Sequence, residues 1–257
     1  MKTPASSSSS SRSRSPWSWV PTLYFAQGLP YIAVMTLSVI MYKRLGISNT
    51  DIALYTGWLY LPWVIKPFWS PFVDIFATKR RWILSMQWLL AVAFAAIAFT
   101  LPLPFYFSLS LAVFWLMGFV SATHDIAADG FYMLALTEHE QSFFVGIRST
   151  FYRIASVAGQ GALVVVAGFI EEASGSVSLA WQTVFIILSV LFLLFALYHT
   201  WALPRPAADT PRSGAGPASE TEHDFLKVFA SFFRKPQALT AIIFMLLYRL
   251  PEASLSK

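Results

Sequence analysis

The sequence predicts an all-α membrane protein, and three observations agree on this fold class. Of the 257 residues, 56% are hydrophobic and only 12% are charged, which is about half the charge of an average soluble domain. The apolar residues form long continuous runs, as in membrane-spanning helices. Segments of about ten residues with alternating polarity, which are typical of a transmembrane barrel, are not visible in the sequence. We therefore expect a bundle of spanning helices.

Residues 1–16 form a Ser- and Arg-rich tail, which we interpret as disordered and cytoplasmic. Six spans are expected in the block 17–203 that follows. Their approximate ranges are 17–42, 51–76, 82–101, 105–136, 143–170 and 181–203. The second span contains Pro62, Pro67 and Pro71, so we expect it to be kinked.

The part of the chain after the sixth span is polar and then apolar again. Residues 204–236 read as a cytoplasmic connector with a short amphipathic helix at 225–233 on the membrane surface. Residues 237–257 read as the start of a seventh, incomplete span. Six helices, a connector and the start of a seventh helix describe the first half of a twelve-helix secondary transporter. The chain is then a fragment, a truncated product or one of two separately encoded halves.

The distribution of Lys and Arg predicts the orientation in the membrane. With six spans, most of the basic residues fall on one side: Lys2, Arg12, Arg14, Lys79, Arg80, Arg81, Arg205, Arg212, Lys227, Arg234 and Lys235. The other side carries Lys43 and Arg44 with the acidic Glu171 and Glu172. We expect a multi-pass protein with a cytoplasmic N-terminus.

Composition also bounds the chemistry. The chain has no Cys and only four scattered His, so thiolate sites are excluded and neither a metal nor a cofactor is expected. The net charge of +5 lies mostly in loops and reflects orientation in the membrane more than nucleic-acid binding. No nucleophile–base pair or nucleotide loop is visible, so a membrane-embedded enzyme, with catalytic residues of its own, is disfavoured.

Two carboxylates, Asp125 and Asp129, lie inside the fourth expected span. Their i, i+4 spacing places both on one helix face, and ionisable groups at membrane depth usually face a bundle interior or a wet pathway. Counting from the turn near residues 138–141, Arg148 matches the depth of Asp129 and Arg153 that of Asp125. Two interpretations remain open, a proton-coupling pair and an ion-pair brace between helix ends.

Other polar residues in the spans are candidates for a charge network. Lys66 needs a carboxylate, backbone carbonyls or an anionic ligand, unless its ammonium extends to the headgroups. Gln27, Gln160 and Arg249 are candidate substrate contacts. His124 lies about 100° around the helix from Asp125, so a hydrogen-bonded structural histidine is favoured over a proton relay.

A gate is predicted where Asp74 ends the second span just before the basic loop. The candidate partners of Asp74 are Arg80 and Arg81, and such a contact would brace helix ends more than bind substrate.

Four motifs together resemble a known family. They are FAQGLPY in the first span, LPWVIKPFWSPFVD in the second, SATHDIAADGFYML in the fourth and YRIASVAGQG in the fifth. They resemble AmpG-type muropeptide permeases and the related acetyl-CoA transporters of the major facilitator superfamily. The resemblance implies a proton-driven carrier with a central cavity, and Lys66, Asp125 and Asp129 match functional or gating positions. The chain departs from the family pattern at Ile75, after the gate aspartate, and at His124.

From these residues we expect a proton symporter of the inner membrane that works by alternating access. The expected cargo is an amphiphilic sugar–peptide such as a muropeptide, with acyl-CoA or another organic anion as the alternative. The expected partners are this cargo, protons, membrane lipids and a separate C-terminal half. The alternative from another class is a non-transporting remnant or a scaffold half that needs a partner.

Overall fold

The structure is a computed structural model that describes residues 14–211 and residue 240. Two compact units are distinguished, 1–210 and 211–257, and the fold described below is that of the first. The expectations for residues 1–13, for the amphipathic stretch 225–233 and for a seventh span with Arg249 lie outside the described residues.

The described residues are helical and contain no strand, which confirms the all-α class. Within residues 14–211, five helices are long and apolar enough to cross a membrane. The first consists of α1 (Val20–Ile32), a π-helical segment (Ala33–Leu37) and α2 (Ser38–Arg44). The next two are α6 (Lys79–Thr100) and α7 (Tyr106–Ala135). The fourth consists of α8 (Glu138–Val157), a second π-helical segment (Ala158–Ala162) and α9 (Leu163–Ser174), and the fifth is α10 (Val177–Ala202).

The segment expected to form the second span is divided instead into short pieces. These are α3 (Asn49–Thr56), α4 (Leu61–Ile65) and α5 (Ser70–Phe76), joined by 3₁₀ turns at Gly57–Tyr60 and Lys66–Phe68. Pro62 and Pro71 lie in the first turns of α4 and α5, and Pro67 lies in the 3₁₀ turn between them. At each of these positions the missing N–H costs no helical hydrogen bond. The six-span count is therefore not confirmed, because the prolines break this segment more than the expected kink would.

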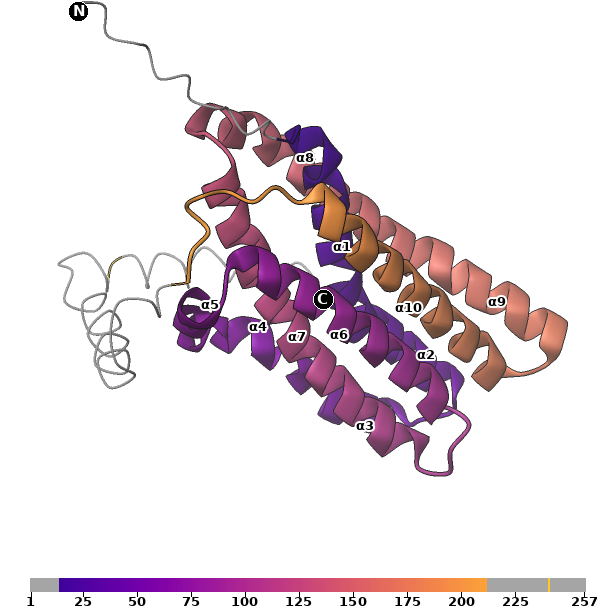
Figure 1. The fold of residues 1–257 in the computed structure, drawn as a ribbon. Helices are drawn as coiled ribbons and strands as arrows, with labels where there is room; N and C mark the ends of the chain where they lie inside the picture. The colour runs from indigo at the N-terminus through magenta and orange to yellow at the C-terminus, as the bar shows by residue number, and fades with distance from the viewer. Residues whose placement is uncertain (1–13, 212–239, 241–257) are drawn as a thin grey trace, which may run out of the picture. The chain divides into compact units, whose positions relative to one another are not determined.

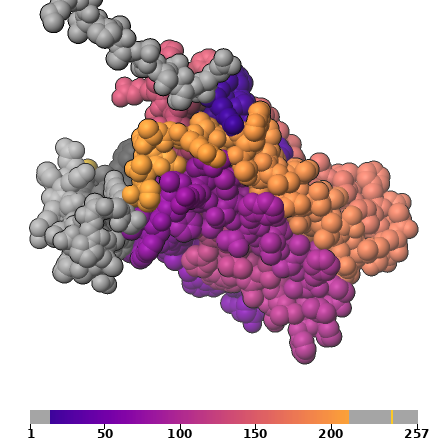
Figure 2. Space-filling view, viewed as in Figure 1, coloured from indigo at the N-terminus to yellow at the C-terminus, as the bar shows by residue number. Residues whose placement is uncertain are grey.

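The helices pack in two groups that meet along α1 and α7. Helix α6 lies between α7 and α10, while α8 packs mainly along α1 (Figure 1). The aromatic rings of Phe94, Phe114, Phe185 and Phe192 fill the space between α6, α7 and α10 and are fully buried. Figure 2 shows α6 and α10 joined in one continuous face.

Helices α1 and α8 approach closely because Gly28 has no side chain. A Cβ atom at Gly28 would lie 2.9 Å from the Cβ of Ala155 and 3.0 Å from the carbonyl oxygen of Tyr152. Gly159 makes a similar contact with Ile32. These contacts allow close helix packing of the kind that membrane proteins obtain from small residues, and they bring the polar residues of α1 and α8 together.

Replacing Gly28 by Ala should therefore destabilise the bundle by about 1–3 kcal/mol, because the added methyl group overpacks the α1–α8 contact. Gly146→Ala in α8 is the matched control, since nothing lies within 4 Å of its Cβ position. It should leave the stability unchanged or raise it by up to about 1 kcal/mol. Thermal denaturation of both variants in detergent compares the two, and equal stabilities would contradict the packing described here.

Candidate functional site

Asp129 is held between α1 and α8. Its Oδ1 accepts a hydrogen bond from the hydroxyl of Tyr24 at 3.2 Å and lies 3.3 Å from Nη1 of Arg148. The same Nη1 donates to the Tyr24 hydroxyl at 3.0 Å. The guanidinium also lies over the rings of Tyr24 and Tyr132, at 5.1 and 5.0 Å from their centroids. The matched depths of Asp129 and Arg148 thus correspond to an ion pair, which Tyr24 completes.

Asp125 lies one turn away, is buried and has a different set of neighbours. Its Oδ2 accepts a hydrogen bond from the indole nitrogen of Trp63 at 3.2 Å and lies 4.0 Å from Nζ of Lys66. Gln27 of α1 also contacts this carboxylate. Lys66, the cation expected in the second span, therefore faces a carboxylate of α7. A carboxylate partner is one of the alternatives that the sequence leaves open for Lys66.

The expected pairing of Asp125 with Arg153 is wrong. Lys66 is the ion-pair partner of Asp125, and Arg153 is exposed on α8. Five residues separate Arg148 from Arg153, which is about 140° around a helix, so the two guanidiniums do not reach the two α7 carboxylates in the same way. In addition, α8 packs mainly along α1, whereas the depth argument considered only α7 and α8.

A polar cavity of about 290 Å³ lies beside Asp129, between α1 and α8. Its lining residues are Tyr24, Gln27, Asp129, Arg148, Ser149, Tyr152 and Arg153. Oε1 of Gln27 is buried and has no hydrogen-bond partner among the described residues, so the cavity has an unused acceptor as well as two guanidiniums. Gln160 is exposed and does not line this cavity.

The predicted gate has a different partner from the one expected. Asp74 forms its ion pair with Lys79, and the stem of Lys79 crosses α7 where Gly130 leaves room. Arg80 instead donates to the carbonyl oxygens of Thr200 at 2.5 Å and of Leu203 at 3.4 Å, at the end of α10.

The side chain of Arg81 is exposed and forms no ion pair within the described residues. Its backbone N–H donates a hydrogen bond to the hydroxyl oxygen of Thr78. Asp209, which the sequence did not single out, accepts hydrogen bonds from the backbone N–H groups of Lys79 and Arg80, at 2.6 and 3.0 Å. It caps the start of α6, where a carboxylate is favourable. The start of α6 thus contacts three other parts of the chain: α5, the end of α10 and the segment that contains Asp209.

His124 belongs to a buried hydrogen-bonded chain that crosses four helices. Its Nε2 lies 3.1 Å from Nε2 of Gln87, and Oε1 of Gln87 lies 3.0 Å from Nδ1 of His199. Nε2 of His199 lies 3.0 Å from Oγ1 of Thr22. His124 is therefore a structural histidine in the core, bonded to Gln87 of α6 and through it linked to α10, and it makes no hydrogen bond with Asp125 in the site. Within residues 14–211 no three His, Asp or Glu side chains are placed to hold a metal ion.

Gln87→Leu should destabilise the bundle by about 2–4 kcal/mol, because it leaves polar atoms of two buried imidazoles without partners. The matched control is Gln182→Leu, since the Gln182 amide bonds to Ser178 within the same helix and should be nearly neutral. Chemical denaturation of both variants in mixed micelles measures the difference. If the Gln87→Leu protein were as stable as the Gln182→Leu protein, the hydrogen bonds through Gln87 would contribute little to the stability of the bundle.

A helical bundle with carboxylates, cations and a polar cavity among its apolar helices is typical of a membrane transporter. The family model of the Major Facilitator Superfamily matches residues 22–253, so the chain belongs to this superfamily of transporters and is a multi-pass membrane protein.

The curated relatives come from bacteria and include named transporters. The chain is 26% identical to "Putative transporter AmpG 4" of Rickettsia conorii, over 91% of the chain and 56% of the relative. It is 27% identical to the "Anhydromuropeptide permease" of Escherichia coli K12, over 90% of the chain and 45% of the relative. An uncharacterized protein of Haemophilus influenzae is 25% identical over 89% of the chain. The chain thus spans about half the length of the curated relatives it matches.

Proposed function

We propose that the protein is a proton-coupled symporter of the inner membrane, with a cytoplasmic N-terminus, that moves an amphiphilic sugar–peptide by alternating access. The observation that carries the proposal is the pair of carboxylates on α7, each of which faces a cation from a different element. Arg148 of α8 lies at Asp129, and Lys66, between α4 and α5, lies at Asp125. Carboxylates at this depth are expected to serve an ion pathway.

The proton would act by changing the attraction between Asp125 and Lys66. This pair is separated by 4.0 Å, so the carboxylate is not locked in a short contact. Protonation removes the negative charge and leaves Lys66 without an ion-pair partner. Because Lys66 belongs to the segmented part of the chain, between α4 and α5, its release would change the position of these short helices relative to α7. Such a change is a physical basis for alternating access.

The cargo would bind in the cavity beside Asp129. Arg153 is exposed there and has no acidic partner in the described part of the chain, so it would bind a carboxylate of the cargo. The unpaired Oε1 of Gln27 would accept an N–H or O–H of a peptide or sugar. The relative named "Anhydromuropeptide permease" supports a sugar–peptide cargo. An acyl-CoA or another organic anion would use the same guanidiniums.

The second candidate function is that of a half that works only with a partner half. The observation that favours it is the coverage of about half of the relatives' length. In a major facilitator two six-helix halves enclose the cargo site, so a second half would complete the enclosure of the cavity.

Uptake into liposomes that contain the purified protein tests the proposal. With a labelled anhydromuropeptide and an inward proton gradient, we expect uptake that depends on the gradient. In the Asp125→Asn and Asp129→Asn variants the uptake should fall about tenfold or more, because each variant loses one charged interaction. Glu138→Gln is the matched control, because Glu138 is an exposed carboxylate at the start of α8, and it should retain the uptake.

Uptake by both aspartate variants at the rate of the control would contradict proton coupling at this pair. Gradient-driven uptake that appears only when a C-terminal half of a relative is present would favour the second candidate function.

A further inference from the structure

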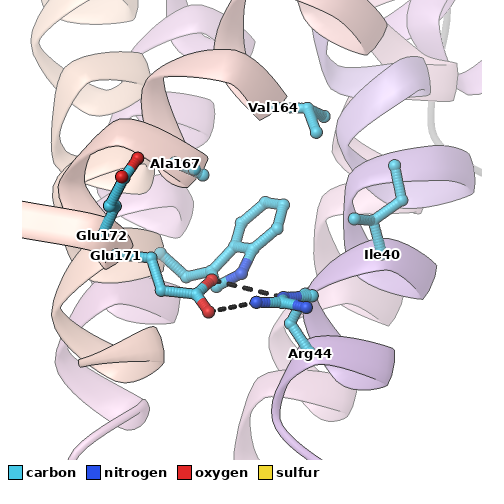
Figure 3. Close-up of a pocket in the computed structure, with 8 residues that line it drawn as sticks. Ile40, Arg44, Val164, Ala167, Glu171 and Glu172 are labelled. Carbon is cyan, nitrogen blue, oxygen red and sulfur yellow. Dashed lines mark hydrogen bonds and ion pairs between the residues drawn. The ribbon is translucent and has the colours of Figure 1, made fainter. Parts of the chain in front are cut away.

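A second cavity, of about 280 Å³, lies between α2, α9 and α10 and shares no lining residue with the cavity of the proposed cargo site. One end of it carries the ion pair between Arg44 and Glu171, which joins α2 to α9 (Figure 3). Its remaining lining residues are Ile40, Val164, Ala167, Gly168, Glu172 and Trp181. The proposed transport mechanism uses none of these residues, so the cavity needs a separate explanation.

The polarity of the cavity changes along the helix axes. Arg44 is the last residue of α2, and Glu171 lies in the last turn of α9, where spanning helices leave the hydrocarbon. Ile40 lies one turn deeper than Arg44, and Val164 lies two turns deeper than Glu171. In Figure 3 Val164 lies at the top of the view and Ile40 at the right, above Arg44 of the ion pair. An amphiphile aligned with the membrane has the same order, with a polar group at the helix ends and an apolar chain below.

The charged groups of the cavity are only partly used by each other. Arg44 donates to Glu171 through Nε, at 3.2 Å, and through Nη2, which leaves Nη1 available as a donor. Glu172 is exposed and forms no ion pair within the described part of the chain. The indole N–H of Trp181 is buried and has no acceptor there either. With one cation and two carboxylates, the cavity is net negative and offers unused donors and one unused carboxylate.

We propose that this cavity binds a zwitterionic phospholipid with a primary ammonium group, of the phosphatidylethanolamine type. The phosphate accepts a hydrogen bond from Nη1 of Arg44, and the ammonium donates to the carboxylate of Glu172. The acyl chain lies along Ile40 and Val164. A phosphatidylcholine headgroup carries the same charges but has no N–H to donate, and an anionic headgroup without an ammonium is repelled by Glu172. The site therefore distinguishes lipids by their headgroup.

The chain offers variants that separate the cavity from the fold. Gly168 lines the cavity, and nothing lies within 4 Å of its Cβ position, so Gly168→Leu fills the cavity without a clash on the backbone. Gly161 also has nothing within 4 Å of its Cβ position but does not line the cavity. Gly161→Leu is therefore the matched control. Glu172→Gln keeps the shape and removes only the charge that binds the ammonium.

Native mass spectrometry of the protein released from nanodiscs with equal amounts of phosphatidylethanolamine and phosphatidylcholine tests the proposal. We expect the unaltered protein and Gly161→Leu to retain phosphatidylethanolamine preferentially. Gly168→Leu should retain about tenfold less of it, and Glu172→Gln should lose the preference by about tenfold while still binding both lipids, the effect of one charge-assisted hydrogen bond.

Equal retention of the two lipids by the unaltered protein would overturn the proposal. A Glu172→Gln protein that keeps the full preference would also overturn it, and this variant lies on the surface, where folding is not at risk. The transport proposal is unaffected by either result, because the two cavities share no residue.

Discussion

The fold is organised around the need of two carboxylates on α7 for partners inside a membrane. An ionised carboxylate without a partner is costly at membrane depth. Asp125 is buried and Asp129 partly buried, and each meets a different part of the chain. Tyr24 of α1 and Arg148 of α8 meet Asp129, while Trp63 and Lys66 of the segmented region meet Asp125. These contacts require α1 to approach α8 closely, which the missing side chain at Gly28 permits. The packing of α1, α8 and the segmented region thus follows from the face of α7 that carries Asp125 and Asp129.

The same arrangement explains why the irregular parts of the backbone lie near this face. Pro62 and Pro67 divide the second apolar segment so that Trp63 and Lys66 turn towards Asp125, and a regular helix would not have the same freedom to adjust. The rest of the bundle consists of longer helices joined by a buried core. The phenylalanine core between α6, α7 and α10 and the buried chain through Gln87 hold the outer helices to α7. A segment of short helices beside one continuous helix is a suitable basis for a coupled change of access.

Much of this could be predicted from the sequence because apolar runs and charge spacing are local signals. They indicated the helical class, the boundaries of most helices and the contact between Asp129 and Arg148. Which helices pack against each other could not be predicted from such local signals. Depth alone pairs Arg153 with Asp125, whereas the main packing partner of α8 is α1. Likewise Gln87 and His199 are far apart in sequence, so their bond is visible only in three dimensions. In the sequence Lys79 is one of three adjacent basic residues in a loop. Its ion pair with Asp74 becomes evident only in the structure, where its side chain passes over Gly130.

The central claim is that proton binding at the α7 carboxylates is coupled to cargo binding, and proton exchange during binding tests it most directly. A pH-sensitive dye in weakly buffered detergent solution would follow protons when an anhydromuropeptide is added to the purified protein, without any need for a complete transport cycle. The account predicts a cargo-dependent pH change for the unaltered protein and none for the Asp125→Asn, Asp129→Asn double variant, with cargo binding checked separately by calorimetry. The same pH change in the double variant would contradict the account.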